Sequence, residues 1–218
     1  MRAPVLLALA VLAGGCVPKA QYAKLQEENA RLKQRIERLD DVAEANLKAY
    51  RELLADFKPL IDRGLLKVEV VDGRITLGMA SDVLFPSGSA ELSASGRENI
   101  GEITKILAAR AKDRDFQVEG HTDDEPISTP QYPSNWHLGA ARAIAVTQFM
   151  VSRGFPEDQI SAASFADNAP VAANGSASGK AQNRRIEIVL LPELSDLPGY
   201  KRLMTEHKGR QRGRGKRK

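Results

Sequence analysis

A long stretch that contains neither glycine nor proline constrains this chain most. Between residues 22 and 58, apolar or seam-type residues recur in alternating steps of four and three, with charged and amide residues between them. This heptad pattern predicts one helix over residues 22–61 with a single apolar stripe. The stripe consists of Leu25, Asn29, Leu32, Ile36, Leu39, Ala43, Asn46, Tyr50, Leu53, Phe57 and Leu60.

The stripe has two interpretations. Such a helix, of about 38 residues, would extend roughly 57 Å. It could associate with copies of itself as a coiled-coil stalk, in which Asn29 and Asn46 would fix the register. It could instead be a single amphipathic helix that lies on its own domain. We expect the coiled coil, and the pattern does not distinguish a dimer from a trimer.

The N-terminus has the layout of an export signal. Arg2 is followed by an apolar run, Val5 to Ala13, which is shorter than the roughly 20 residues that cross a bilayer as a helix. Small residues then lead to Cys16, the only cysteine, which cannot form an internal disulfide. The sequence "LAGGC" resembles the lipobox of bacterial lipoproteins, although Ala13 stands where leucine is usual. The resemblance implies that residues 1–15 are a signal peptide and that Cys16 carries a lipid. An ordinary signal peptide with an incidental cysteine is the alternative.

Residues 64–193 have the pattern of a mixed helix and strand domain. Alternating segments meet at Asp72-Gly73, a two-residue hairpin signal. Val83 to Phe85 reads as a further strand, and Ser95 with Glu98 suggests a capping box that opens a helix. Later segments alternate strand-like and helical patterns; they are a strand at 116–120, a helix at 136–153, a short strand at "ISAASF" and a long strand at "NRRIEIVLL". We therefore expect an α+β fold with the helices on one face of the sheet. Trp136, at a helix start, is expected to anchor in the core, with a platform for a sugar ring as the alternative.

The C-terminus is strongly basic. Residues 208–218 hold seven Lys or Arg and no acid, within a low-complexity tail that we expect to be disordered from residue 194 to 218. In an exported protein, contact with anionic glycan strands or lipid headgroups fits this tail better than nucleic acid, so we expect no nucleic-acid partner. A solvated tail without a specific partner is equally open.

Asp123 and Arg142 form the candidate site. Asp123 follows the strand at 116–120, and Arg142 lies in the second turn of the next helix, whose free N–H groups already favour an anion. Arginine binds a carboxylate with two parallel hydrogen bonds, and aspartate accepts a hydrogen bond from an ammonium group. The pair could receive a zwitterion, or it could be a direct Asp123–Arg142 salt bridge. Spacing alone does not decide between them.

Three stretches resemble a known family. "GHTDDEPI", "YPSNWHLGAARA" and "NRRIEIVL" resemble the OmpA-like C-terminal family, which includes the peptidoglycan-associated lipoproteins and the periplasmic part of flagellar motor stator protein B. The resemblance covers about residues 75–191. It implies an OmpA-like β-α-β-α-β sheet, preceded here by the long coiled-coil helix. The loop of residues 124–134 resembles the long version found in stator proteins.

The resemblance also implies a ligand, because this family binds meso-diaminopimelate of the peptidoglycan stem peptide without cleaving it. By that likeness Asp123 would hold the ligand's amine and Arg142 its carboxylate. The sequence departs from the family at Gly139, where serine is usual, and near "SFADNAP", where the family's glycines are absent. The other residues implied are Thr122, Asn135 and Leu138 for the pocket floor, and Arg184 with backbone groups after Phe85 for the rim.

Other chemistries have weaker support. His121 stands among acidic residues, but neither His137 nor His207 gives a metal-ligand spacing, so we expect no metal and no cofactor. No Gly-x-Ser-x-Gly elbow is present, and we expect no enzyme; a wall hydrolase stays a distant alternative. A motor stator would need an acidic membrane-spanning helix, whereas the only long apolar run, residues 3–13, has no acid.

We expect an outer-membrane lipoprotein that faces the periplasm. A lipid on Cys16 would anchor it to the membrane, and residues 16–63 would carry the domain of residues 64–193 to the cell wall, which it would bind non-covalently. Association of the stalks into a homo-oligomer would add avidity. The alternative is an envelope assembly protein, in which the coiled coil recruits partners and wall binding only positions it.

Overall fold

The computed structural model describes residues 19–71, 73–111 and 113–191, and it divides the chain into two compact units, residues 1–51 and 52–218. The predicted signal peptide, Cys16 and the predicted tail of residues 194–218 lie outside the described residues. Within the described ranges, none of the helices combines the length and the apolar character that crossing a bilayer requires.

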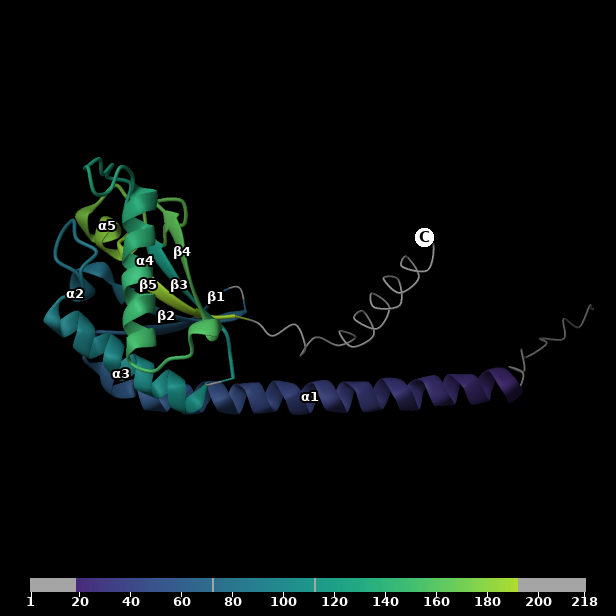
Figure 1. Cartoon of the computed structure of the whole chain (residues 1–218). Coiled ribbons are helices and arrows are strands. Elements are labelled where there is room, and N and C mark those ends of the chain that lie inside the picture. The colour runs from purple at the N-terminus through teal and green to yellow at the C-terminus, as the bar shows by residue number, and fades with distance from the viewer. Residues whose placement is uncertain (1–18, 72, 112, 192–218) are drawn as a thin grey trace, which may run out of the picture. The chain divides into compact units, whose positions relative to one another are not determined.

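The first helix, α1, runs without interruption over Lys19–Asp62 and includes Pro59 in its last turn (Figure 1). Its apolar stripe is exposed in one part and buried in another. In the first unit, Leu25, Leu32, Ile36 and Leu39 are exposed. In the second unit, Leu53, Phe57 and Leu60 are buried in the core of the domain. The end of α1 is therefore part of the folded domain, although the heptad pattern assigned these three residues to the stalk.

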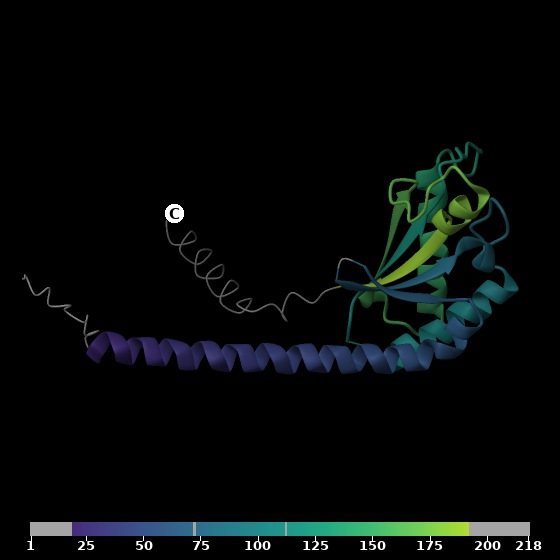
Figure 2. The same cartoon turned by 180° about the vertical axis from the view of Figure 1, so that it is seen from behind.

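Five strands form one mixed sheet in the order β1-β2-β5-β3-β4. Neighbours are antiparallel except β3 and β4, which are parallel. The last strand of the chain thus lies in the middle of the sheet, which Figure 2 shows from behind. The strands span Lys67–Val71 for β1, Arg74–Ala80 for β2, Phe116–His121 for β3, Ile160–Ala166 for β4 and Arg185–Leu190 for β5.

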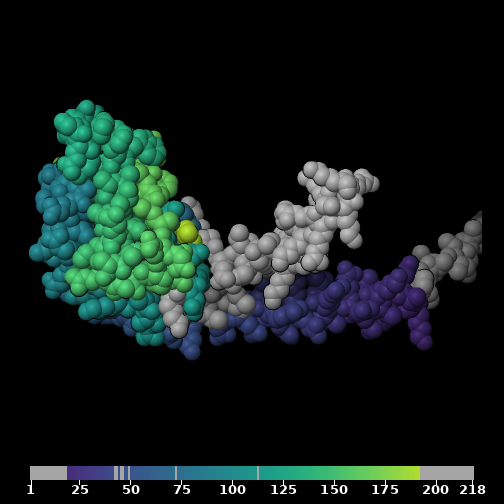
Figure 3. Space-filling view, viewed as in Figure 1, coloured from purple at the N-terminus to yellow at the C-terminus, as the bar shows by residue number. Residues whose placement is uncertain are grey.

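Two long helices, α3 (Ala94–Arg110) and α4 (Asn135–Ser152), pack over the sheet, with α4 lying against β3 and β4 (Figure 1). Alternation along the strands sends one set of side chains towards these helices, as expected for a sheet with one covered face. The core between them is continuous with the end of α1; its fully buried members include Phe57, Ile100, Leu107, Val118, Val146, Met150, Ile186 and Ile188. The α+β prediction is confirmed. In Figure 3 the green residues around α4 cover the face of the domain that is turned towards the viewer.

Several local predictions were wrong. Val83–Phe85 is not a strand, because Ser81–Leu84 forms the short helix α2, which the Phe85 N–H closes by donating to the Ser81 carbonyl. Helix α3 is capped by Ser93, whose hydroxyl accepts from the Gly96 N–H at 2.9 Å, and not by Ser95. Trp136 is 52% exposed and is no core anchor.

Two short helices had no counterpart in the prediction. Glu157–Gln159 forms a 3-10 turn, η1, before β4. Ala177–Asn183 forms α5 directly before β5, and its N-cap Ser176 accepts from the Gly179 N–H at 3.0 Å. Helix α5 therefore fixes the position of Arg184, which follows it directly, and the start of β5.

Candidate functional site

A pocket of about 180 Å³ lies where β3 ends, α4 begins and the chain enters β5. Six of the seven predicted ligand-binding residues line it, and Phe85 does not. The lining consists of Asp82, Ser87, Gly88, Thr122, Asp123, Glu125, Pro126, Ile127, Asn135, Leu138, Arg142 and Arg184. The sequence patterns thus located the pocket, although its residues come from four separate stretches of chain.

Asp123 is paired with Arg184, not with Arg142. Its Oδ2 accepts from Arg184 Nη1 at 2.8 Å, and its Oδ1 accepts from the Glu125 N–H at 3.3 Å. Arg184 also donates from Nη2 to Asp82 Oδ2 at 3.1 Å. These hydrogen bonds, first to Asp123 and then to Asp82, raise the pKa of Arg184. The direct salt bridge that spacing left open between Asp123 and Arg142 is therefore not formed.

Arg142 is buried without an ion pair in the described part of the chain. Only 4% of the residue is exposed, and within the domain its Nε donates to the Ser89 carbonyl at 2.8 Å. Its guanidinium lies 5.2 Å from the centre of the Phe85 ring, a cation–π contact. Burial lowers the pKa of Arg142, yet a guanidinium stays charged at any physiological pH. The pocket lining thus holds a charge that has no ion pair among the described residues.

Phe85 itself does not line the pocket, and its ring contacts the Arg142 guanidinium. The resemblance assigned the rim to groups after Phe85, and Ser87 and Gly88 of this segment line the pocket.

The remaining predicted residues hold the pocket wall in place. Thr122 donates its hydroxyl to the Asp123 carbonyl at 2.9 Å, and its N–H donates to the Ala166 carbonyl at 2.8 Å. Asn135 closes the loop after β3 by donating to the carbonyls of Asp123 and Glu125 at 3.2 and 3.0 Å. Leu138 packs in a small second core with Tyr132 and Ala90. Thr122 and Asn135 thus fix the Asp123 backbone through hydrogen bonds of their own.

Sequence reasoning missed three residues that contribute to the pocket or to the segments around it. Asp82 shares Arg184 with Asp123, and Lys180 forms ion pairs with Asp124 and Glu125 that hold the loop and raise the pKa of Lys180. Asn183 is fully buried, and its Oδ1 accepts from the N–H groups of Val171 and Ala172 at 2.8 and 3.0 Å. A signal for Asn183 was present in "NRR", where an amide precedes two arginines at a strand start.

Both departures from the family pattern have a structural counterpart. At Gly139 a Cβ would lie 2.4 Å from Ser164 Oγ, so this position is tightly packed against β4. Ala166 adopts a φ of 49°, in the left-handed region that favours glycine, at the end of β4. The chain therefore keeps a glycine-type turn after its penultimate strand but places an alanine in it.

The pocket can receive a molecule that carries both signs of charge. Arg142 offers a guanidinium that forms no ion pair within the described ranges, and Asp123 offers a carboxylate in the same pocket, where it is paired with Arg184. A ligand with a carboxylate and an ammonium group satisfies both, since arginine binds carboxylates and aspartate binds ammonium groups.

Comparisons with known proteins agree with this architecture. Residues 84–184 match the OmpA family. The chain is 35% identical over 144 residues to the uncharacterized protein YtxE of Bacillus subtilis (strain 168), covering 64% of this chain and 59% of that protein. It is 34% identical over 118 residues to the probable lipoprotein YiaD of Escherichia coli (strain K12), covering 54% and 52%.

A solved structure is also similar. The cell wall anchor of the T6SS from Pseudomonas aeruginosa superposes with a TM-score of 0.60 at 33% identity, over 65% of this chain and 97% of that one. The chain spans between about half and three fifths of the length of the two curated relatives described. The similarity therefore concerns the domain and not the whole length of those proteins.

Proposed function

Because this chain belongs to the OmpA family through the domain that contains residues 84–184, we propose that it binds peptidoglycan non-covalently. The ligand is the diaminopimelate of the stem peptide, and the domain is a binding module rather than an enzyme. The relative whose printed description is a cell wall anchor supports this proposal for the domain.

The observation that carries the proposal is the state of Arg142. A buried guanidinium without an anionic partner costs free energy, because desolvation disfavours the charge. Its Nε and the Phe85 ring hold it in place, so the rest of the guanidinium remains for a ligand. A stem-peptide carboxylate would supply two parallel charge-assisted hydrogen bonds there.

The ammonium group of diaminopimelate would bind Asp123. That carboxylate is held by the Glu125 N–H on one oxygen and by Arg184 on the other. An ammonium that approaches Oδ2 replaces Arg184, which keeps Asp82 as its partner. Thr122 and Asn135 support this exchange indirectly, since they fix the backbone of Asp123.

Beyond binding the wall, the proposed role of the protein is to tether the outer membrane to it. We propose that Cys16 is lipidated, that the protein is anchored in the outer membrane facing the periplasm, and that the domain links that membrane to the wall. The relative described as a probable lipoprotein supports the anchor. The exposed stripe of Leu25, Leu32, Ile36 and Leu39 supports association of α1 with copies of itself.

The proposal is tested by co-sedimentation with purified peptidoglycan sacculi. The full chain, carrying Cys16→Ser to prevent lipidation, is pelleted with sacculi in the presence and absence of free diaminopimelate. We expect binding that free diaminopimelate competes away, and a loss of at least tenfold in affinity for Asp123→Asn and for Arg142→Ala.

Matched variants separate the pocket from general charge effects. Asp113→Asn removes an exposed carboxylate that does not line the pocket, and Arg97→Ala removes an exposed arginine of α3. Both are expected to pellet like the parent chain. If Asp123→Asn and Arg142→Ala pellet as well as their controls, the pocket does not bind the wall.

The alternative function is that of an assembly protein. The exposed stripe in the first unit favours it too, because such a stripe would equally bind a partner helix. Replacing Leu32 and Ile36 by aspartate distinguishes the two in sedimentation equilibrium. A self-associating stalk makes the parent chain an oligomer and the variant a monomer. A helix that binds another protein leaves both the parent chain and the variant monomeric.

A further inference from the structure

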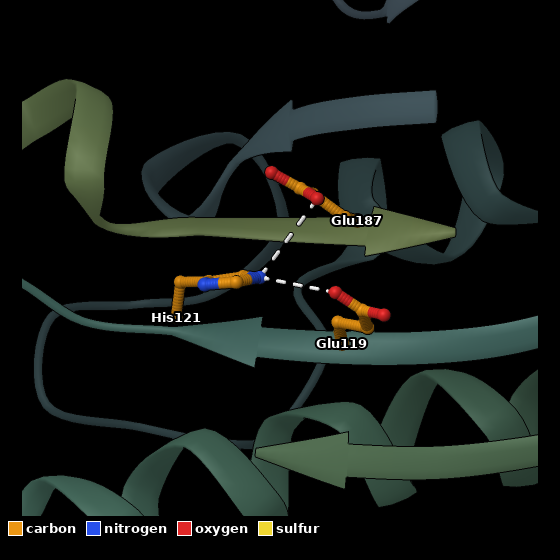
Figure 4. Close-up of side chains that lie close together, drawn as sticks. All are labelled: Glu119, His121 and Glu187. Atoms are coloured by element: carbon orange, nitrogen blue, oxygen red, sulfur yellow. Dashed lines mark ion pairs between the residues drawn. The ribbon is translucent and has the colours of Figure 1, made fainter. Parts of the chain in front are cut away.

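A second polar cluster lies two residues before Asp123, on strands β3 and β5. Glu119 and His121 are two residues apart on β3 and so share one face of the sheet, and Glu187 is the register partner of Glu119 on β5. Figure 4 shows the imidazole directed towards both carboxylates. All three are buried or nearly so: 3% of Glu119 and 2% of His121 are exposed, and 15% of the Glu187 side chain is exposed.

The imidazole has no hydrogen-bond partner in the described part of the chain. His121 Nε2 lies 3.6 Å from Glu119 Oε2 and 3.9 Å from Glu187 Oε2, which is beyond hydrogen-bond length. Both ring nitrogens are buried and unpartnered, and the ring stacks on Phe165 at 5.2 Å. A buried polar group without a partner needs an explanation, and the geometry offers one.

We propose that Glu119, His121 and Glu187 bind a divalent transition-metal ion, with Zn²⁺ as the preferred ion. One donor atom from each residue lies within 4.8 Å of the others. Two donors bound to a tetrahedral zinc at about 2.1 Å are about 3.4 Å apart, close to the two separations from Nε2. Imidazole with carboxylate suits zinc and its neighbours, whereas Mg²⁺ and Ca²⁺ favour sites made wholly of oxygen.

Two arginines complete the surroundings. Arg185 Nε donates to Glu187 Oε1, and Arg74 Nη1 lies 3.8 Å from Glu119 Oε1. Each carboxylate thus directs one oxygen towards an arginine and the other towards the imidazole. Outer partners of this kind orient ligating carboxylates, although their positive charge also lowers the affinity for a cation. Water would fill the remaining coordination position.

The proposed ion would join the two strands that border the pocket residues. His121 is the last residue of β3 and directly precedes Thr122 and Asp123, and Arg184 directly precedes β5. This site is distinct from the pocket, and the inference does not rest on peptidoglycan binding. The spacing of histidines in the sequence predicted no metal site, since two of these ligands come together only through the pairing of β3 with β5.

Zinc binding to the full chain carrying Cys16→Ser tests the proposal, because this change removes the only thiol. We expect isothermal titration with Zn²⁺ to show a saturable site that Mg²⁺ does not compete for. We expect zinc at a hundredfold excess over Kd to raise the Tm by about 5–11 °C. Co²⁺ in place of zinc should give visible absorption bands on binding.

The matched control is His137→Gln, which removes an exposed histidine of α4 and should leave zinc affinity unchanged. His121→Gln and Glu187→Gln should each weaken zinc binding at least tenfold, with circular dichroism to confirm that each variant folds. Glu187→Gln keeps the test decisive if His121→Gln fails to fold. Absence of saturable zinc binding in the parent chain, or equal affinity in Glu187→Gln, overturns the proposal.

Discussion

Gly120 of β3 and Gly139 of α4 face each other in direct backbone contact. A Cβ placed on Gly120 would lie 2.0 Å from the Gly139 carbonyl oxygen, a separation that real Cβ atoms do not show. This contact brings the N-terminal part of α4 onto the end of β3, and so places Arg142 and Asp123 in one pocket.

Gly120→Ala should therefore destabilise the domain strongly. Backbone has to move to admit the methyl group, and we expect a loss of about 3 kcal/mol in the free energy of unfolding. Denaturant unfolding followed by circular dichroism measures it. Gly101→Ala is the control, because a Cβ there meets nothing within 4 Å, and it should be neutral or stabilising. Similar unfolding midpoints for the two variants would contradict the close contact.

Ala166 should tolerate glycine and reject valine. Its φ of 49° costs an alanine about 1–2 kcal/mol, which glycine relieves at the expense of greater freedom in the unfolded chain. We expect Ala166→Gly to be as stable as the parent or up to about 1 kcal/mol more stable. Ala166→Val should lose about 2 kcal/mol or more, because a β-branched residue fits this region poorly. Thermal unfolding compares them, and greater stability of the valine variant would refute the left-handed turn.

Arg142→Met should stabilise the fold while it removes binding. Burial lowers the pKa of Arg142, so the folded state disfavours the charged form, and at every pH below that pKa the charge costs folding free energy. An apolar side chain of similar length removes this cost, and we expect a gain of about 1 kcal/mol in stability. Chemical denaturation gives the stability, and sacculus pelleting gives the binding. A large loss of stability would show that Arg142 has a structural role instead.

The end of α1 should be needed for a stable domain. Phe57 is fully buried in the core, and Phe57→Ala should cost about 4 kcal/mol. Ile144→Ala, at a position that is 46% exposed on α4, should cost less than about 1 kcal/mol. A fragment of residues 52–191 should accordingly unfold at a higher temperature than one of residues 63–191. Equal melting temperatures for the two fragments would exclude α1 from the core.

The sequence was most informative where a single pattern sufficed. Periodicity predicted α1, α3, α4 and the alternating strands, and family-like motifs indicated Asp123, Arg142 and Arg184, which share one pocket. Tertiary contacts decided the rest. Val83 and Leu84 have strand-like character, yet the Ser81 N–H donates to the Arg184 carbonyl and the segment turns as α2.

Partners across strands could not be predicted for the same reason. Which group neutralises Asp123 depends on where β5 begins, and α5 sets that position without a strong helical pattern of its own. The meeting of Glu119 with Glu187 depends on the central place of β5 in the sheet, which no local pattern specifies.

The pairing of Arg184 with Asp123 makes the pocket resemble an ion exchanger. In the proposed binding, an arriving ammonium group would not fill a vacant carboxylate but would take the position of the Arg184 guanidinium, which would keep Asp82 as its partner. The free energy of each attachment would then be the difference between two similar ion pairs, so single contacts would form and release readily. A set of such sites along the wall would hold firmly as a group while each one continues to turn over.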